Sequence, residues 1–366
     1  MMQKNKIINV LMGLSILLVL SGCNTQQRKG MNKLLIIKEQ GSFTVGGTVI
    51  QNPGTYNREK FDNFKPYPEG QTCHGDHAYV FYQIPDKARP LPLVFLHGAG
   101  QSSKTWETTP DGREGFQNIF LRKGFSTYLI DQPRRGKAGR SSVASTIEPV
   151  ADEQMWYEIF RIGIWPDYHE GVQFPKDRQS LENFFRQMTP NTGAFDNEVI
   201  SNSMSALFDK AGSGILITHS QGGLPGWITG IKNQNVKAIV AYEPGTYPFP
   251  EGELPEPVSG RTGTLSGVEV SMEDFLKLTK IPIVMYFGDY IPDEITNELG
   301  AENWRTRLAL GRLFVEAINR YGGDATLVEL PKIGIHGNTH FPMSDLNNIE
   351  IADLLLAWMR EKELDK

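Results

Sequence analysis

The sequence lacks the features of several protein classes. It has only two cysteines in 366 residues, so at most one disulfide could form and a disulfide-built fold is excluded. Lysine and arginine are scattered and the net charge is −5, which argues against nucleic-acid binding. No apolar run reaches the ~18–20 residues that span a bilayer. The length of 366 residues instead suits one large α/β domain with insertions or two small domains, and 39% of hydrophobic residues is ordinary for a globular protein.

The N-terminus has the pattern of an export signal. Lys4 and Lys6 precede an apolar run over residues 7–20. Such a run fits the hydrophobic region of a secretory signal. The run ends in LSGC, which resembles a bacterial lipobox and implies cleavage before Cys23 and acylation of that cysteine. The alternative is an ordinary signal peptide that happens to contain a cysteine.

The lipobox predicts how the chain is divided. Residues 1–22 would be a lipoprotein signal peptide, 23–33 a polar tether and 34–366 the folded domain. Lipid on Cys23, rather than basic charge, would hold the protein at a membrane of the bacterial cell envelope. Cys73 would then have no disulfide partner, and its surroundings predict an incidental or structural thiol.

Beyond residue 34 the pattern alternates between strand and helix. After β-rich segments at 34–37 and 42–50, strands are predicted at 77–84, 91–96, 126–130, 214–218, 236–242, 281–287 and 325–330. Helices are predicted at 114–123, 221–231, 301–321 and 347–362. This order predicts an α/β protein with a mostly parallel, doubly wound sheet.

Two stretches interrupt the alternation. Residues 134–212 are too long for one crossover and are rich in aromatic side chains. Such a segment within a compact domain predicts an inserted helical lid or cap. Its aromatic residues could line an apolar substrate pocket or form the lid's own core. Residues 245–275, rich in proline and glycine, form a second excursion.

A serine between a buried strand and a helix is the central functional signal. The string THSQGG at 218–223 follows the apolar run GILIT and precedes the predicted helix. A nucleophile elbow needs such a sharp turn, with small residues beside the serine. Gly222 and Gly223 meet this need, whereas Thr218 stands where the usual G-x-S-x-G pattern has glycine. Ser220 is therefore the predicted nucleophile, and a helix-capping serine is the alternative.

A glycine-rich loop, HGAGQ at 97–101, follows an earlier buried strand. This loop and the serine motif, in this order, resemble the α/β-hydrolase fold. In that fold the loop turns a main-chain N–H toward the substrate carbonyl oxygen, and the residue after the nucleophile supplies a second. The predicted oxyanion donors are Ala99 and Gln221. No G-x-G-x-x-G or G-K-[ST] spacing follows, so a phosphate-binding loop is not expected.

Only two histidines follow Ser220, and the fold orders its triad as serine, acid, histidine. Both lie between the last predicted strand and the closing helix. His340 is the predicted base because it is nearer the helix and follows a Gly-Asn turn, while His336 is the alternative and would order the loop. Their spacing predicts no metal site, since Gly337 and Asn338 would break the helix that aligns both rings.

Two places offer the acid of the triad. Glu243 ends the strand predicted at 236–242, whereas Asp289 and Asp293 follow the strand predicted at 281–287. The second place is the commoner one in this fold. A glutamate at the mouth of a buried strand is nevertheless unusual without a partner, because burial of a carboxylate is costly unless it is paired. The residues alone leave the choice open.

Six motifs taken together resemble a small group of bacterial α/β-hydrolase esterases with a Ser–His–Glu triad. They are HGAGQSS, DQPRRGKAGRSS, THSQGG, AYEPG, FGDYI and GIHGNTHF. The similarity spans roughly residues 40–362. It implies Ser220, Glu243 and His340 as the triad, with Ala99 and Gln221 as oxyanion donors. The group can carry cysteine in the oxyanion loop, where this chain has Ala99 and Gly100, so any role of that cysteine does not transfer.

The expected activity is hydrolysis of a small-molecule carboxylic ester through an acyl-enzyme on Ser220. No metal or cofactor is expected for this chemistry. Thioesterase, lactonase or acyltransferase activity on the same triad is an alternative. A further alternative is a lipid-anchored binding protein with a catalytically dead hydrolase fold. The complete set of serine, acid and histidine argues against a dead enzyme.

Overall fold

The computed structural model describes residues 34–261 and 263–366. The predicted signal peptide, the predicted lipidation site Cys23 and the predicted tether lie outside these described residues. From Ile37 to Lys366 the chain forms one compact unit. In the part of the chain that the structure describes, no helix combines the length and the apolar character needed to cross a bilayer.

The unit is built on an eight-stranded sheet with the order β1-β2-β4-β3-β7-β8-β13-β14. The strands are β1 (Ile37–Gln51), β2 (Thr72–Pro85), β3 (Leu93–Leu96), β4 (Thr127–Asp131), β7 (Gly214–His219), β8 (Val236–Tyr242), β13 (Pro282–Phe287) and β14 (Asp324–Glu329). β2 is antiparallel to both of its neighbours, and the six strands from β4 to β14 are parallel. The prediction of a mostly parallel α/β sheet is therefore confirmed.

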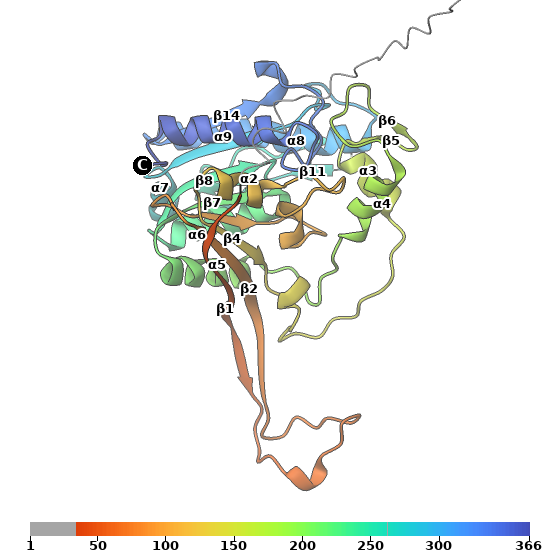
Figure 1. The fold of residues 1–366 in the computed structure, drawn as a ribbon, viewed down its shortest axis with the longest axis vertical. Coiled ribbons are helices and arrows are strands. Elements are labelled where there is room, and N and C mark those ends of the chain that lie inside the picture. Colours follow the sequence, from red (N-terminus) through yellow and green to blue (C-terminus); the bar gives the residue numbers. More distant parts are fainter. Residues whose placement is uncertain (1–33, 262) are drawn as a thin grey trace, which may run out of the picture. The chain divides into compact units, whose positions relative to one another are not determined.

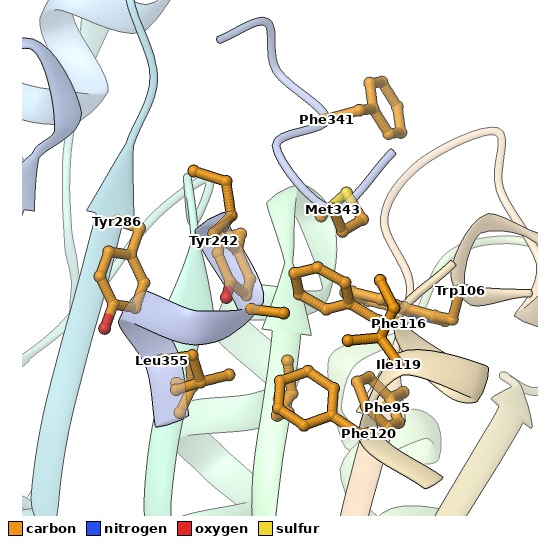
Figure 2. Packing of buried hydrophobic residues seen from close by; sticks show 14 of the residues in the cluster. Phe95, Trp106, Phe116, Ile119, Phe120, Tyr242, Tyr286, Phe341, Met343 and Leu355 are labelled. Atoms are coloured by element: carbon orange, nitrogen blue, oxygen red, sulfur yellow. The ribbon is translucent and has the colours of Figure 1, made fainter. Parts of the chain in front are cut away.

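Helices cover both faces of this sheet (Figure 1). They are α2 (Phe116–Arg122), α5 (Asn197–Ala211), α6 (Gly223–Lys232), α7 (Met272–Leu278), α8 (Leu299–Arg320) and α9 (Asn348–Glu361). Successive side chains of a strand point to opposite faces, so β7 contributes to two separate cores. Ile217 belongs to the core with α2 and α9, and Leu216 to the core with α5, α6 and α8. Figure 2 shows part of the first core, where Phe116 and Leu355 pack near Tyr242.

β1 and β2 form a ribbon that extends beyond the rest of the sheet (Figure 1). They pair from Ile37 opposite Pro85 to Gln51 opposite Thr72, whereas β4 pairs with β2 only over Tyr79–Gln83. The β-rich segment predicted at 42–50 lies within β1, which begins earlier than predicted, at Ile37. The segment predicted at 34–37 is mostly wrong, because residues 34–36 are not in a strand. Cys73 is a free thiol in the extended part of this ribbon.

The segment predicted as a lid, 134–212, contains two kinds of structure. Its first part holds α3 (Glu153–Ile159), the short hairpin of β5 (Gly163–Ile164) and β6 (Asp167–Tyr168), and α4 (Arg178–Arg186). Its last part is α5, which packs on α6, β1 and β2 and is an ordinary layer helix. The insertion proper therefore ends before α5. Several of its aromatic side chains are buried in the core shared with α2 and α9, namely Tyr157, Phe160, Phe184 and Phe185.

The second excursion, 245–275, forms small pairs of strands at the edge of the domain. They are β9 (Pro248–Pro250) with β12 (Val268–Val270), and β10 (Val258–Gly260) with β11 (Gly263–Leu265). Their short length follows from the prolines and glycines in this stretch, which interrupt regular strand pairing.

Candidate active site

Ser220 lies where β7 ends and a single 3-10 turn, Ser220–Gly222, leads into α6. Its φ of +55° is in the left-handed region, which a residue with a side chain rarely adopts. The chain therefore turns sharply at the serine instead of extending the strand. This is the backbone conformation that a nucleophile elbow requires.

The turn is tight, and glycines make it possible. A Cβ atom added to Gly222 would lie 2.7 Å from the His97 carbonyl oxygen, and one added to Gly223 would lie 2.6 Å from Cβ of Pro244. A Cβ atom added to Gly226 would lie 2.5 Å from Cγ2 of Thr218. Thr218 is thus accommodated because the helix facing it has a glycine. This compensation could not be read from the G-x-S-x-G pattern, because Gly226 stands outside it.

The glycine-rich loop at 97–101 packs directly against the serine. A Cβ atom on Gly98 would lie 2.7 Å from Cβ of Ser220. The loop's carbonyl groups are occupied, because Gly98 O accepts from Arg135 Nη1 at 2.7 Å and Gly100 O accepts from Thr189 N at 2.9 Å. Among the described residues the Ala99 N–H donates to no group, so it is available to a ligand. Gln221, the other predicted donor, directly follows the serine.

Arg135 binds the glycine-rich loop, a role that the sequence did not predict. It is 1% exposed, and its other hydrogen bonds go to Asn191 Oδ1 and to the carbonyl oxygen of Gln101. Burial lowers the pKa of Arg135 to about 10, which leaves it charged at neutral pH. A buried positive charge therefore holds the loop that carries the free Ala99 N–H. Arg135 lies within the motif DQPRRGKAGRSS, but its hydrogen-bond partners could be identified only from the folded structure.

His340 and Glu243 form a buried pair. His340 Nδ1 and Glu243 Oε2 are 2.5 Å apart, and neither residue is more than 1% exposed. Because the carboxylate accepts, Nδ1 carries the proton of the neutral imidazole and Nε2 carries the lone pair. Nε2 has no hydrogen-bond partner within residues 34–261 and 263–366. A general base needs this tautomer.

Hydrogen bonds link this pair to the serine turn. His219, next to Ser220, donates from Nε2 to the His340 carbonyl oxygen at 2.8 Å, and the two rings lie 4.4 Å apart. On the other side, Gly245 N donates to the carbonyl oxygen of Ser220 at 2.9 Å. The serine is therefore bonded through its neighbours to the segments that carry His340 and Glu243.

The alternative acid Asp289 lies next to the alternative base His336, and neither residue bonds to Glu243 or to the His340 side chain. His336 Nδ1 is 3.4 Å from Asp289 Oδ2, which also accepts from Gly337 N at 2.8 Å. The His336 side chain is 67% exposed. Asp293 is also exposed and pairs with Arg312. The fold thus brings Glu243, and neither aspartate, to His340.

The described residues hold no group of three or more histidine, cysteine, aspartate or glutamate side chains placed to bind a metal ion. The side chain of His336 is exposed, whereas that of His340 is buried.

A buried arginine from the insertion completes the surroundings of Glu243. Arg161, just after α3, bonds through Nη2 to Glu243 Oε1, which also accepts from Gly288 N at 2.7 Å. Burial by itself raises the pKa of Glu243, but Arg161 and His340 outweigh it and lower that pKa to about 2. Glu243 is therefore ionised although it is fully buried. No sequence pattern relates position 161 to position 243, so this contact could not be predicted from the sequence.

The charge state of His340 follows from the same surroundings. Burial lowers the pKa of His340, Glu243 opposes this effect, and Arg161 and Arg307 add to it, with a resulting pKa of about 4. Burial and the neighbouring His340 also hold the pKa of His219 well below its ordinary value. At neutral pH both imidazoles are uncharged, and His340 can accept a proton at Nε2.

Two known proteins are similar to this chain, one in sequence and fold and the other in sequence. A bacterial esterase of known atomic-resolution structure is 33% identical with a TM-score of 0.71, and the match covers 90% of this chain and 97% of the esterase. A probable secreted lipase, phiG, of Fungal sp. (strain ATCC 74256) is 28% identical over 338 residues, which are 83% of this chain and 88% of the lipase. No family model matches the sequence. With its parallel sheet and its strand–serine–helix turn, the chain belongs to the α/β-hydrolase superfamily.

Proposed function

We propose that this hydrolase cleaves carboxylic esters through an acyl-enzyme on Ser220. The observation that carries the proposal is the buried Glu243–His340 pair, which is hydrogen-bonded through His219 to the strained turn at Ser220. The relatives support an ester substrate, since one is an esterase and the other a probable lipase.

The proposed reaction begins with proton transfer from the Ser220 hydroxyl to His340 Nε2 while the serine oxygen attacks the ester carbonyl. Glu243 orients the imidazole and stabilises its charged form. The N–H groups of Ala99 and Gln221 hold the oxyanion, and one such donor is worth about 2.7–4 kcal/mol. The imidazolium then protonates the leaving alcohol. Water, activated by His340, attacks the acyl-enzyme, releases the acid and restores Ser220.

Labelling of the serine tests the proposal. Protein lacking residues 1–22 should react with a fluorophosphonate probe, Ser220→Ala should not, and Ser259→Ala, which changes an exposed serine in β10, should label like the wild type. A panel of oxygen esters, thioesters and lactones of graded acyl length then separates an esterase from a thioesterase or lactonase. Formation of a new ester with an added alcohol, in place of the free acid, would indicate an acyltransferase. Absence of labelling and of turnover in the wild type would favour a dead hydrolase fold and contradict the proposal.

We also propose that lipid on Cys23 anchors the protein in the bacterial cell envelope, with a membrane and a small-molecule ester as its partners. The apolar run before Cys23 supports export, as does the similarity to a probable secreted lipase. Metabolic labelling with an alkyne fatty acid should mark the wild type but not Cys23→Ser. Equal labelling of Cys73→Ser and wild type is the matched control.

A further inference from the structure

The feature that carries a further inference is the pair of residues Phe160 and Arg161, just after α3. Three loops meet there, each following a different strand. Phe160 O accepts from His340 N at 2.9 Å, in the loop after β14. Arg161 Nε donates to Asp289 O at 2.8 Å, after β13, and Arg161 Nη2 bonds to Glu243, after β8. One short segment of the insertion thus holds both members of the buried acid–base pair.

We propose that Arg161 is a positioning residue that orients the Glu243–His340 pair and extends the activity toward acidic pH. The inference rests on the proposed function, in which this pair activates Ser220. The insertion is then part of the catalytic apparatus.

Burial makes the contact between Arg161 and Glu243 necessary. Both side chains are 0% exposed, and a buried charge without a partner is strongly unfavourable. The guanidinium is held on its other side by the Trp304 ring, with 5.6 Å between Arg161 Cζ and the ring centroid. The same Trp304 ring lies 4.0 Å from the His340 ring. The guanidinium is therefore confined in place beside the pair, and lysine could not reproduce its two directed hydrogen bonds.

The sign of the pH effect follows from the charges around His340. Glu243, directly after β8, stabilises the charged form of His340 and raises its pKa. Arg161 in the insertion and Arg307 on α8 destabilise that charged form and lower the pKa. His219 at the end of β7 is buried and neutral, so it contributes no fixed charge. The ring's other neighbours, on α8 and around Phe160, are aromatic. One further buried carboxyl group lies close by: Asp345 accepts from Thr339 N, next to His340, and burial raises its pKa to about 7. Asp345 is present in the wild type and in every Arg161 variant, so it does not change the direction of the shift between them.

Glu243 and His340 titrate as a unit because they share a hydrogen bond. A proton added to either group abolishes the form in which His340 is neutral and Glu243 charged. The positive charge of Arg161 opposes this protonation wherever the proton resides. A neutral residue at 161 should therefore move the acid limb of the activity to higher pH.

The test measures the rate constant of fluorophosphonate labelling between about pH 3.5 and 9 on the full chain. For Arg161→Met we expect the midpoint of the acid limb to rise by about one unit, in the range of shifts that a nearby charge produces. For Arg161→Lys, which keeps the charge, we expect the wild-type midpoint with a slower plateau rate. Arg178→Met, which changes an exposed arginine of α4, should match the wild type. Circular dichroism checks that each variant is folded.

An unchanged midpoint in folded Arg161→Met would overturn the inference while leaving the proposed function intact, because the wild type would still label at Ser220. Failure of the proposed function is distinct, since the wild type itself would then not label. If Arg161→Met does not fold, Arg161→Gln takes its place with the same expected shift. If neither folds, Arg161→Lys decides: a slower plateau supports the positioning role, and a wild-type plateau refutes it.

Discussion

The replacement Glu243→Gln is the sharpest test of the acid in this site, because the surroundings dictate how the amide would sit. Glu243 Oε1 accepts from Gly288 N and from Arg161, so the oxygen of a glutamine amide would take that position. The NH₂ group would then face His340 Nδ1. An amide donor there forces Nδ1 to accept, which places the imidazole proton on Nε2. His340 would keep its place but lose its function as a base.

The expected loss is large. In the serine proteases, exchange of the triad aspartate for asparagine inverts the same tautomer and lowers kcat about 10⁴-fold. A loss of that size here corresponds to about 5 kcal/mol of transition-state stabilisation. The variant should also be less stable than the wild type, because Arg161 loses its carboxylate partner in a fully buried place.

The assay is kcat and KM for a p-nitrophenyl ester at pH 7.5, with thermal unfolding recorded on the same samples. Asp289→Asn is the matched control, since that carboxylate bonds to Gly337 N, Tyr290 N and His336 rather than to His340. We expect Asp289→Asn to keep kcat within about tenfold of the wild type, well short of the 10⁴-fold loss on inverting a triad tautomer. A greater loss of kcat in Asp289→Asn than in Glu243→Gln would refute the assignment of Glu243.

Because the pKa of His340 is lowered to about 4, its neutral base form is lost only as pH falls through that value, so kcat/KM of the wild type should be nearly constant from pH 7 to about 5 and fall below it. Gly226→Ala should lower the free energy of unfolding by about 1–3 kcal/mol, since its Cβ would lie 2.5 Å from Cγ2 of Thr218, and Thr218→Gly in the same chain should restore part of it in denaturant titrations. Arg135→Met should lower kcat toward the ~10²–10³-fold loss of an oxyanion donor with little change in KM, and an unaltered kcat in the folded variant would contradict a role in holding the oxyanion loop.

Elements defined by neighbouring residues could be predicted from the sequence. The apolar run before Ser220, the turn and the following helix are contiguous, and the structure has them within a few residues of the expected bounds. The strand at 236–242 is observed with its predicted bounds. Regular periodicity over a short window is enough for such elements, because the hydrogen bonds of a helix and the alternation of a strand are local. The continuous β1 and the packing of α5 on the sheet were missed, since both depend on partners distant in sequence.

The sequence by itself determined the fold class, the alternation of the parallel strands with most of their helices, and a short set of candidate site residues. The residues alone left the acid open between positions 243 and 289, and the resemblance to Ser–His–Glu esterases favoured Glu243. The tertiary structure places Glu243, and not Asp289, next to His340. The reason is electrostatic. A fully buried Glu243 is ionised because His340 and Arg161, the latter 82 positions earlier in the chain, lie against it. That contact is formed by the folding of the insertion onto the sheet, and no local pattern encodes it.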